Sequence, residues 1–184
     1  MIRKMLAAAV VVALGGVAFG AEIKSGPQSG EKVPGPFHPL NVTGEDAGKK
    51  ACLYCKNGEN PVAVVFARTA DDPNVTRLIK ALDKATEQNT KCEMGSFVVY
   101  LSGDEKLEGK LKQMAQKEGL KQIVLSIESP TGPEKYNINK DADVTVLLYA
   151  ERTVKANYAF EKGKLDAKAI DQIVKDVSKI TPAK

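Results

Sequence analysis

The residues with the most distinctive chemistry in this chain are its three cysteines. Cys52 and Cys55 form a Cys-x-x-Cys pair, and Cys92 stands alone. Thiols can bridge as disulfides, exchange disulfides or ligate a metal. An odd count leaves at least one thiol outside any intramolecular pair. With three cysteines and one histidine in 184 residues, the composition excludes a disulfide-dense scaffold and a zinc site with two or more histidine ligands.

Whether Cys52 and Cys55 can bridge depends on the backbone between them. In an extended strand, Cα atoms three residues apart are separated by ~10 Å. A disulfide needs a Cα separation of roughly 4.4–6.8 Å. The bridge can therefore form only if this segment turns. The sequence Lys56-Asn57-Gly58 that follows favours a turn, so the bridge is feasible.

The order of the elements predicts where the cysteines lie. Cys55 precedes an apolar run at 62–67, and Cys92 precedes a second run at 96–101; both runs have the composition of buried strands. If these strands are parallel neighbours, their amino ends share one edge of the sheet. We therefore expect all three cysteines near that edge.

Three interpretations of the cysteines stay open at this point. The first, which we favour, is a structural disulfide, either Cys52–Cys55 or one of these with Cys92. The second is a displaced redox pair at Cys52 and Cys55, with Cys92 as a third thiol. The third is a metal site of Cys52, Cys55 and Cys92, with or without His38. His38 lies in a Pro-rich segment, and we expect it to be a surface residue of a flexible arm. We expect no cofactor.

The hydrophobic pattern predicts one α/β domain. A third buried strand is expected at 122–127, two amphipathic helices at 75–85 and 107–115, an antiparallel hairpin at 144–150 and 153–160, and a last helix at 169–180 opened by Asp166. The alternation of strands and helices predicts right-handed crossovers. The expected fold is a mostly parallel sheet with helices on both faces and an antiparallel C-terminal hairpin.

This layout resembles the thioredoxin-like superfamily, in its redoxin or peroxiredoxin-type form. The resemblance covers roughly residues 33–180. Three stretches carry it: VAVVFARTADDPNVTRLIKAL, IVLSIESPTGPEKYNI and DVTVLLYAERTVKANYAFEKGKLD. They match the central strand with its loop and helix, the redoxin strand with a Tyr after it, and the closing hairpin. The resemblance implies a thioredoxin-like fold.

The family's chemistry depends on Cys-x-Pro-Cys after the central strand, where the helix N-terminus activates a thiolate. This chain has Asp71-Asp72-Pro73-Asn74 there, so the proline is present and both sulfurs are missing. Asp and Asn favour a helix start, so we predict that this segment still caps the following helix although it lacks a nucleophilic thiol. The family's cis-Pro position is occupied by Val144, which lacks the tertiary amide that makes a cis bond accessible. These departures weigh against ordinary thioredoxin or peroxidase activity.

Arg68, Asp71 and Asp72 could form a small polar site at the carboxyl ends of the strands, where open α/β sheets bind ligands. We interpret them instead as a solvated helix start.

The N-terminus predicts an export signal. Arg3 and Lys4 precede an apolar run at 5–14, and Ala18-Phe19-Gly20 favours cleavage after Gly20. The expected organisation is a signal peptide at 1–20, a Pro/Gly-rich arm at 21–50 and a thioredoxin-like domain at 51–184. The mature protein would then be periplasmic or secreted, in a compartment where disulfides persist. We expect no stable membrane insertion after cleavage.

The charge balance points away from nucleic acid. Lys and Arg number 27 against 23 Asp and Glu, and removing Arg3 and Lys4 leaves 25 against 23. The lysines of the 105–118 segment are balanced by glutamates, which is typical of a solvated helix face. We therefore predict a non-catalytic binding or structural module for an unidentified protein or small molecule. The alternatives are an atypical thiol–disulfide oxidoreductase acting through Cys52 and Cys55, and a metal-binding module.

Overall fold

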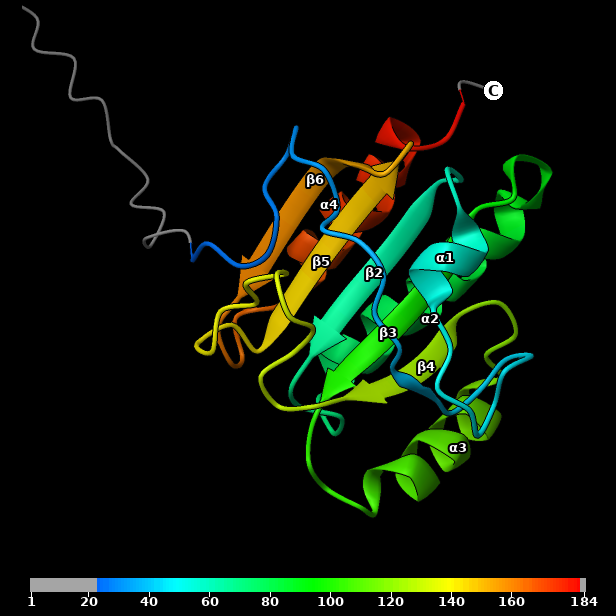
Figure 1. Cartoon of the computed structure of the whole chain (residues 1–184), viewed down its shortest axis with the longest axis vertical. Helices are drawn as coiled ribbons and strands as arrows, with labels where there is room; N and C mark the ends of the chain where they lie inside the picture. Colours follow the sequence, from blue (N-terminus) through cyan, green and yellow to red (C-terminus); the bar gives the residue numbers. More distant parts are fainter. Residues whose placement is uncertain (1–22, 183–184) are drawn as a thin grey trace, which may run out of the picture.

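A computed structural model describes residues 23–182 of the chain, so the predicted signal peptide lies outside the described residues. Its centre is a six-stranded sheet in the order β1-β4-β3-β2-β5-β6 (Figure 1). The strands are β1 Leu40–Asn41, β2 Val62–Ala67, β3 Gly95–Leu101, β4 Val124–Glu128, β5 Val144–Ala150 and β6 Thr153–Phe160. The helices are α1 Leu53–Asn57, α2 Pro73–Gln88, α3 Leu107–Glu118 and α4 Ala167–Asp176, with single 3₁₀ turns at Thr90–Cys92 and Val177–Lys179.

The sheet is mixed, with a parallel centre. β2, β3 and β4 run parallel to one another, β5 is antiparallel to β2, and β6 closes the antiparallel hairpin with β5. All six residues of β2 are buried, as its unbroken apolar sequence predicts for a central strand covered on both faces. The predicted α/β fold and its C-terminal hairpin are confirmed.

The two faces of the sheet are covered differently (Figure 1). The long helices α2, α3 and α4 pack together against one face, the back face, and bury the apolar stripes predicted for them. The other face, the front face, carries the short α1, the N-terminal segment and the connection between β4 and β5. Helices on both faces are confirmed, although three of the four lie on the back. Within residues 23–182, no helix combines the length and apolarity needed to span a bilayer.

The N-terminal segment crosses the front face from one edge of the sheet to the other (Figure 1). At the β6 edge, the N–H of Gly30 donates to the carbonyl of Val154 at 2.8 Å. At the far edge, β1 pairs antiparallel with β4. Between these edges Phe37 is buried, with its ring centroid 6.2 Å from that of Phe66. The expectation of a flexible arm is therefore wrong, because its apolar side chains complete the front core.

Candidate functional site

Cys52 and Cys55 form a disulfide at the start of α1. Their sulfur atoms are 2.06 Å apart and their Cα atoms 5.2 Å apart. The segment turns as the bridge requires, because Leu53 begins a helical turn for which Cys52 is the N-cap. The N–H of Cys55 donates to Sγ of Cys52 at 3.0 Å. Of the pairings that the sequence leaves open, the structure contains this one.

The disulfide is anchored on one side and exposed on the other. Cys52 is half-buried against the front core, whereas Cys55 is exposed. Between them Tyr54 is buried, and the guanidinium of Arg152 lies over its ring, 5.3 Å from the centroid. The ring centroid of Tyr149 lies 6.5 Å from that of Tyr54. The bridge therefore fixes a one-and-a-half-turn helix whose apolar side is part of the core.

The cation next to Cys55 is already paired. Nζ of Lys56 lies 2.7 Å from a carboxylate oxygen of Glu45 and 3.7 Å from Asp46. The hydrogen bond to Glu45 raises the pKa of Lys56, and the same bond lowers the pKa of Glu45. An unpaired cation would stabilise a thiolate at Cys55. Its pairing with two carboxylates weakens that effect.

Cys92 is separate from the bridge. It is the free cysteine, half-buried, and its thiol donates to the carbonyl oxygen of Asn89 at 3.1 Å. It lies beside Pro61, at the amino edge of β2, as the element order predicts. However, Cys92 packs against the back core and Cys52 against the front core, so the sheet separates them.

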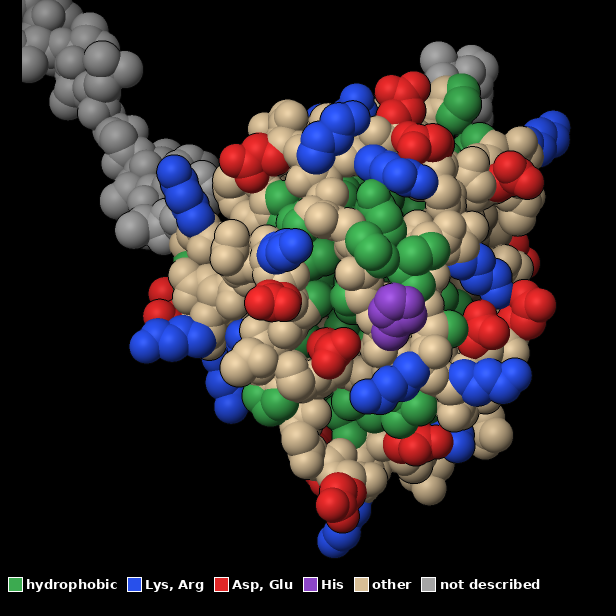
Figure 2. Space-filling view, viewed as in Figure 1, with side chains coloured by type: hydrophobic (Ala, Val, Ile, Leu, Met, Phe, Trp, Pro, Cys, Tyr) green, Lys and Arg blue, Asp and Glu red, His purple; other side chains and the backbone are tan. Residues whose placement is uncertain are grey.

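The predicted metal set of Cys52, Cys55 and Cys92 does not form in the described part of the chain. No group of three or more His, Cys, Asp or Glu side chains in residues 23–182 is arranged to hold a metal ion. Two of the three sulfurs are bridged to each other, and the third lies on the opposite face. His38 is exposed, and Figure 2 shows it at the surface of the front face beside apolar side chains.

At the start of α2, where the resemblance to thioredoxin-like proteins would place a thiol, this chain has a carboxylate. Asp72 is the N-cap of α2, and its side chain accepts from the N–H of Asn74 at 2.7 Å and of Val75 at 3.4 Å. Pro73 is the first helical residue, where its missing N–H costs nothing. Asp71 is exposed. The predicted capping role is confirmed, and the N–H groups that could stabilise a thiolate already bind a carboxylate.

Arg68 does not join Asp71 and Asp72 in a polar site. Its guanidinium donates to the carbonyl oxygens of Pro130 at 2.7 Å, Ala142 at 3.1 Å and Asn139 at 3.3 Å. It therefore fastens the β4–β5 connection to the carboxyl end of β2. The sequence interpretation missed this role of Arg68. Its partners are backbone carbonyl groups, which every residue has, so the sequence does not reveal them.

The hydrogen bonds of Arg68 form a clamp on the β4–β5 connection. Beside this Arg68 clamp, a second contact holds the residue that precedes β5. The hydroxyl of Thr69 donates to the buried carboxylate of Asp143 at 2.7 Å. The next residue, Val144, pairs with Ala67 of β2. Residues 23–182 contain no cis peptide bond, and Val144, where the resemblance led us to expect a cis-proline position, lies in an ordinary strand.

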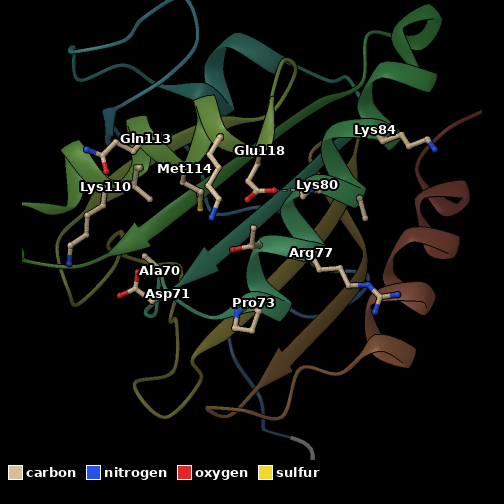
Figure 3. A pocket seen from close by; sticks show the side chains of 14 residues that line it. Ala70, Asp71, Pro73, Arg77, Lys80, Lys84, Lys110, Gln113, Met114 and Glu118 are labelled. Atoms are coloured by element: carbon tan, nitrogen blue, oxygen red, sulfur yellow. Dashed lines mark hydrogen bonds and ion pairs between the residues drawn. The ribbon is translucent and has the colours of Figure 1, made fainter.

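A groove that the sequence interpretation also missed lies between α2 and α3 on the back face. Its volume is about 1030 Å³. Basic residues from both helices line it, and one end reaches Asp71 and Pro73 (Figure 3). The two helices are neighbours because β2, β3 and β4 are consecutive parallel strands, so both right-handed crossovers lie on one face.

The architecture described above is that of the thioredoxin-like fold. Solved structures with this architecture include a thiol peroxidase from Chromobacterium violaceum, 15% identical, with a TM-score of 0.59 over 84% of this chain and 88% of that chain. A reduced 2-Cys peroxiredoxin from Plasmodium vivax is 19% identical, with a TM-score of 0.60 over 84% and 96%. A secreted disulfide oxidoreductase from Mycobacterium tuberculosis, homologous to E. coli DsbE, is 11% identical, with a TM-score of 0.53 over 77% and 94%.

These similarities define the fold and leave the activity open. No protein-family model matches the chain, and no curated protein sequence matches it significantly. At such identities a shared fold does not imply a shared reaction. The expected resemblance to redoxins and peroxiredoxins is confirmed as a structural one.

Proposed function

We propose that this chain is an exported thioredoxin-fold module that works by binding or by a structural role, and that its disulfide stabilises the fold. The observation that carries the proposal is the capping of α2 by Asp72. A thioredoxin-type reaction needs a thiolate at this helix start, stabilised by free N–H groups and the helix dipole. Here a fixed carboxylate accepts those hydrogen bonds, and it carries a negative charge that would oppose a thiolate.

The surroundings of Cys52–Cys55 support a structural bridge. The cysteines lie at the amino edge of β2, the pole opposite to Asp72, and α1 has only five residues. The adjacent lysine is paired with Glu45 and Asp46. Closing so short a loop stabilises the fold by about 2 kcal/mol in the chain-entropy picture. The bridge also holds Tyr54 against Tyr149 in the front core.

Export is the part of the proposal that rests on sequence. The basic, apolar and small-residue regions of residues 1–20 have the order of a secretory signal. A bridged Cys52–Cys55 pair fits an oxidising compartment, since cytosolic thiols are kept reduced. Fractionation of cells carrying the tagged chain tests this: the processed protein, shortened at Gly20, is expected outside the cytoplasm. Retention of an unprocessed chain in the cytoplasm would refute export.

The competing function is thiol–disulfide exchange through Cys52 and Cys55. One observation favours it: the bridge begins a helical turn, and Cys55 is exposed to a partner thiol. An insulin-reduction assay on the oxidised and reduced protein separates the two functions. We expect no turnover above that of the Cys52→Ser/Cys55→Ser variant. We also expect thiol titration to give one free thiol before reduction and three after it, as the bridge and Cys92 require.

The matched control is Cys92→Ser, which removes a thiol and leaves the bridge. Under our proposal, loss of the bridge lowers the stability by about 2 kcal/mol without changing any activity. Turnover that survives in Cys92→Ser and disappears in Cys52→Ser would establish the oxidoreductase instead.

A further inference from the structure

The groove between α2 and α3 combines an apolar floor with basic rims. Leu111 is buried, and Met114 and Ala81 are half-buried at the floor. The rims carry five basic residues, which are Arg77, Lys80 and Lys84 on α2 and Lys110 and Lys117 on α3. In Figure 3, Lys80 and Glu118 meet between the two helices, whereas the ends of Arg77 and Lys84 point outward at the outer side of the α2 rim. The lining contains only two carboxylates, Asp71 and Glu118.

Three of these cations have carboxylate partners. Lys80 lies 2.8 Å from Glu118, which also lines the groove. Lys110 lies 3.4 Å from Asp104, and Arg77 lies 3.8 Å from Asp171. The cationic side chains in these three pairs are each about half exposed, so another carboxylate could replace a partner at little cost.

The remaining two cations stand without a partner in the described structure. Lys84 and Lys117 are exposed and form no ion pair with any residue of 23–182. They come from different helices and line the same groove. The groove therefore has unneutralised positive charge on both rims above an apolar floor.

The spacing of the cations fits a linear ligand. Arg77 and Lys84 are seven residues apart on α2, and Lys110 and Lys117 are seven residues apart on α3. Seven residues of helix rise by ~10.5 Å. In a polyproline II chain, which has three residues per turn, every third side chain lies on the same face and about 9.3 Å further along. Each rim thus matches a peptide in this extended conformation with acidic residues at every third position.

We propose that this groove binds an acidic peptide segment of a partner protein, with carboxylates on the basic rims and an apolar side chain against Met114 and Leu111. This inference rests on the proposed binding function and names its site and partner class. Nucleic acid fits less well, because no aromatic residue lines the groove for base stacking and Asp71 and Glu118 would repel phosphates. A compact anion would contact neither the full length of the groove nor its apolar floor.

The test is fluorescence anisotropy with a labelled peptide of three Glu-Leu-Ser repeats, at low and at physiological salt. We expect saturable binding that weakens with salt, as for any exposed charge contact. A peptide in which Lys replaces every Glu should not bind. Amide chemical shifts should change along α2 and α3.

Matched variants locate the site. Lys84→Glu/Lys117→Glu should raise the dissociation constant by about tenfold or more, because it reverses the two unpaired charges. Lys162→Glu/Lys164→Glu makes the same change in net charge at an exposed turn after β6 and should alter affinity less than about twofold. Met114→Gln should weaken binding without changing its salt dependence.

Several results would overturn the proposal. They are no saturable binding, equal effects of the two charge-reversal pairs, or tighter binding of a single-stranded oligonucleotide than of the acidic peptide. Such a failure leaves the proposed non-catalytic role standing, since that role is tested by insulin reduction. Turnover in the insulin assay would in turn refute the non-catalytic role whether or not the peptide binds.

Discussion

A Cβ atom added to Gly95 would clash with the side-chain oxygen of Asn57. Asn57 is the last residue of α1, and its amide donates to the carbonyl of Leu53 at 2.7 Å. Gly95 begins β3, and its N–H donates to Pro61 at 2.9 Å. The disulfide-bridged helix and the sheet are thus in contact at a position where a side chain would clash with Asn57 unless its amide moves.

Gly95→Ala should therefore destabilise the protein. The new methyl group must displace the side-chain amide of Asn57 and disturb its hydrogen bond to Leu53, at a cost of about 1–3 kcal/mol. Denaturant unfolding measures this. The Asn57→Ala background removes the obstructing amide, so the same substitution should cost at least about 0.5 kcal/mol less there.

Gly109→Ala is the matched control. Gly109 is inside α3, and a Cβ there meets no atom within 4 Å, so alanine should stabilise the protein by up to about 1 kcal/mol. Equal costs of Gly95→Ala in the two backgrounds would show that the contact with Asn57 does not decide the choice of glycine.

The elements were largely predictable because their signals are local. The hairpin strands at 144–150 and 153–160 were predicted with the bounds that β5 and β6 have, and Asp166 caps α4 through the N–H of Ala169 at 2.8 Å. Strand β4 was predicted at 122–127 and spans Val124–Glu128. That shift arises because the N–H groups of residues 121–123 bind the carboxylate of Asp83, a distant partner.

The site was less predictable because it depends on faces and on strand order. From the order of the elements we predicted that the cysteines lie at one edge of the sheet. That order does not reveal that Cys52 lies on the front face, whereas Cys92 follows a helix on the back face. Likewise, the groove exists only because α2 and α3 are neighbours, which requires the order β4-β3-β2. Lys84 and Lys117 belong to separate amphipathic patterns, so each sequence segment alone indicates a solvated face.

The cap at the start of α2 gives a second prediction. Asp72→Ala removes the acceptor for the N–H groups of Asn74 and Val75 and should cost about 0.5–2 kcal/mol in thermal or denaturant unfolding. Asp71→Ala is the control, since Asp71 is exposed and is not the cap. It should change the stability by less than about 0.5 kcal/mol. Equal effects would mean that the helix does not depend on the Asp72 cap.

The Arg68 clamp gives a third prediction. Arg68→Ala removes the guanidinium from three carbonyl oxygens of the β4–β5 connection, of which that of Asn139 keeps the N–H of Ala142, and should cost about 1–3 kcal/mol. The loss should be local, so amide hydrogen exchange should accelerate in residues 129–142 before the sheet is affected. Arg77→Ala removes an exposed guanidinium 3.8 Å from Asp171 and serves as the control. Unchanged exchange in 129–142 would argue against the clamp.

A buried carboxylate behind the hairpin makes stability depend on pH. Asp176 accepts from the hydroxyl of Tyr158, from Nε2 of Gln172 at 2.9 Å and from Nζ of Lys179 at 2.7 Å. Burial alone would raise the pKa of Asp176, but the hydrogen bonds from Lys179 and Tyr158 outweigh it and hold the pKa below the ordinary 3.8. The folded state therefore binds this proton less readily than the unfolded chain does.

The sign of the effect follows from that difference. A carboxyl whose pKa is lowered by folding stabilises the protein above its unfolded pKa, and this contribution is lost as pH falls through the folded value. We expect Asp176→Asn to lower the free energy of unfolding by about 1–3 kcal/mol at neutral pH. The difference from the parent protein should shrink as pH falls below about 4. Glu161→Gln, at an exposed turn, is the control. Urea unfolding at a series of pH values measures both variants, and a difference that stays constant down to acid pH would exclude the charged form of Asp176 as its cause.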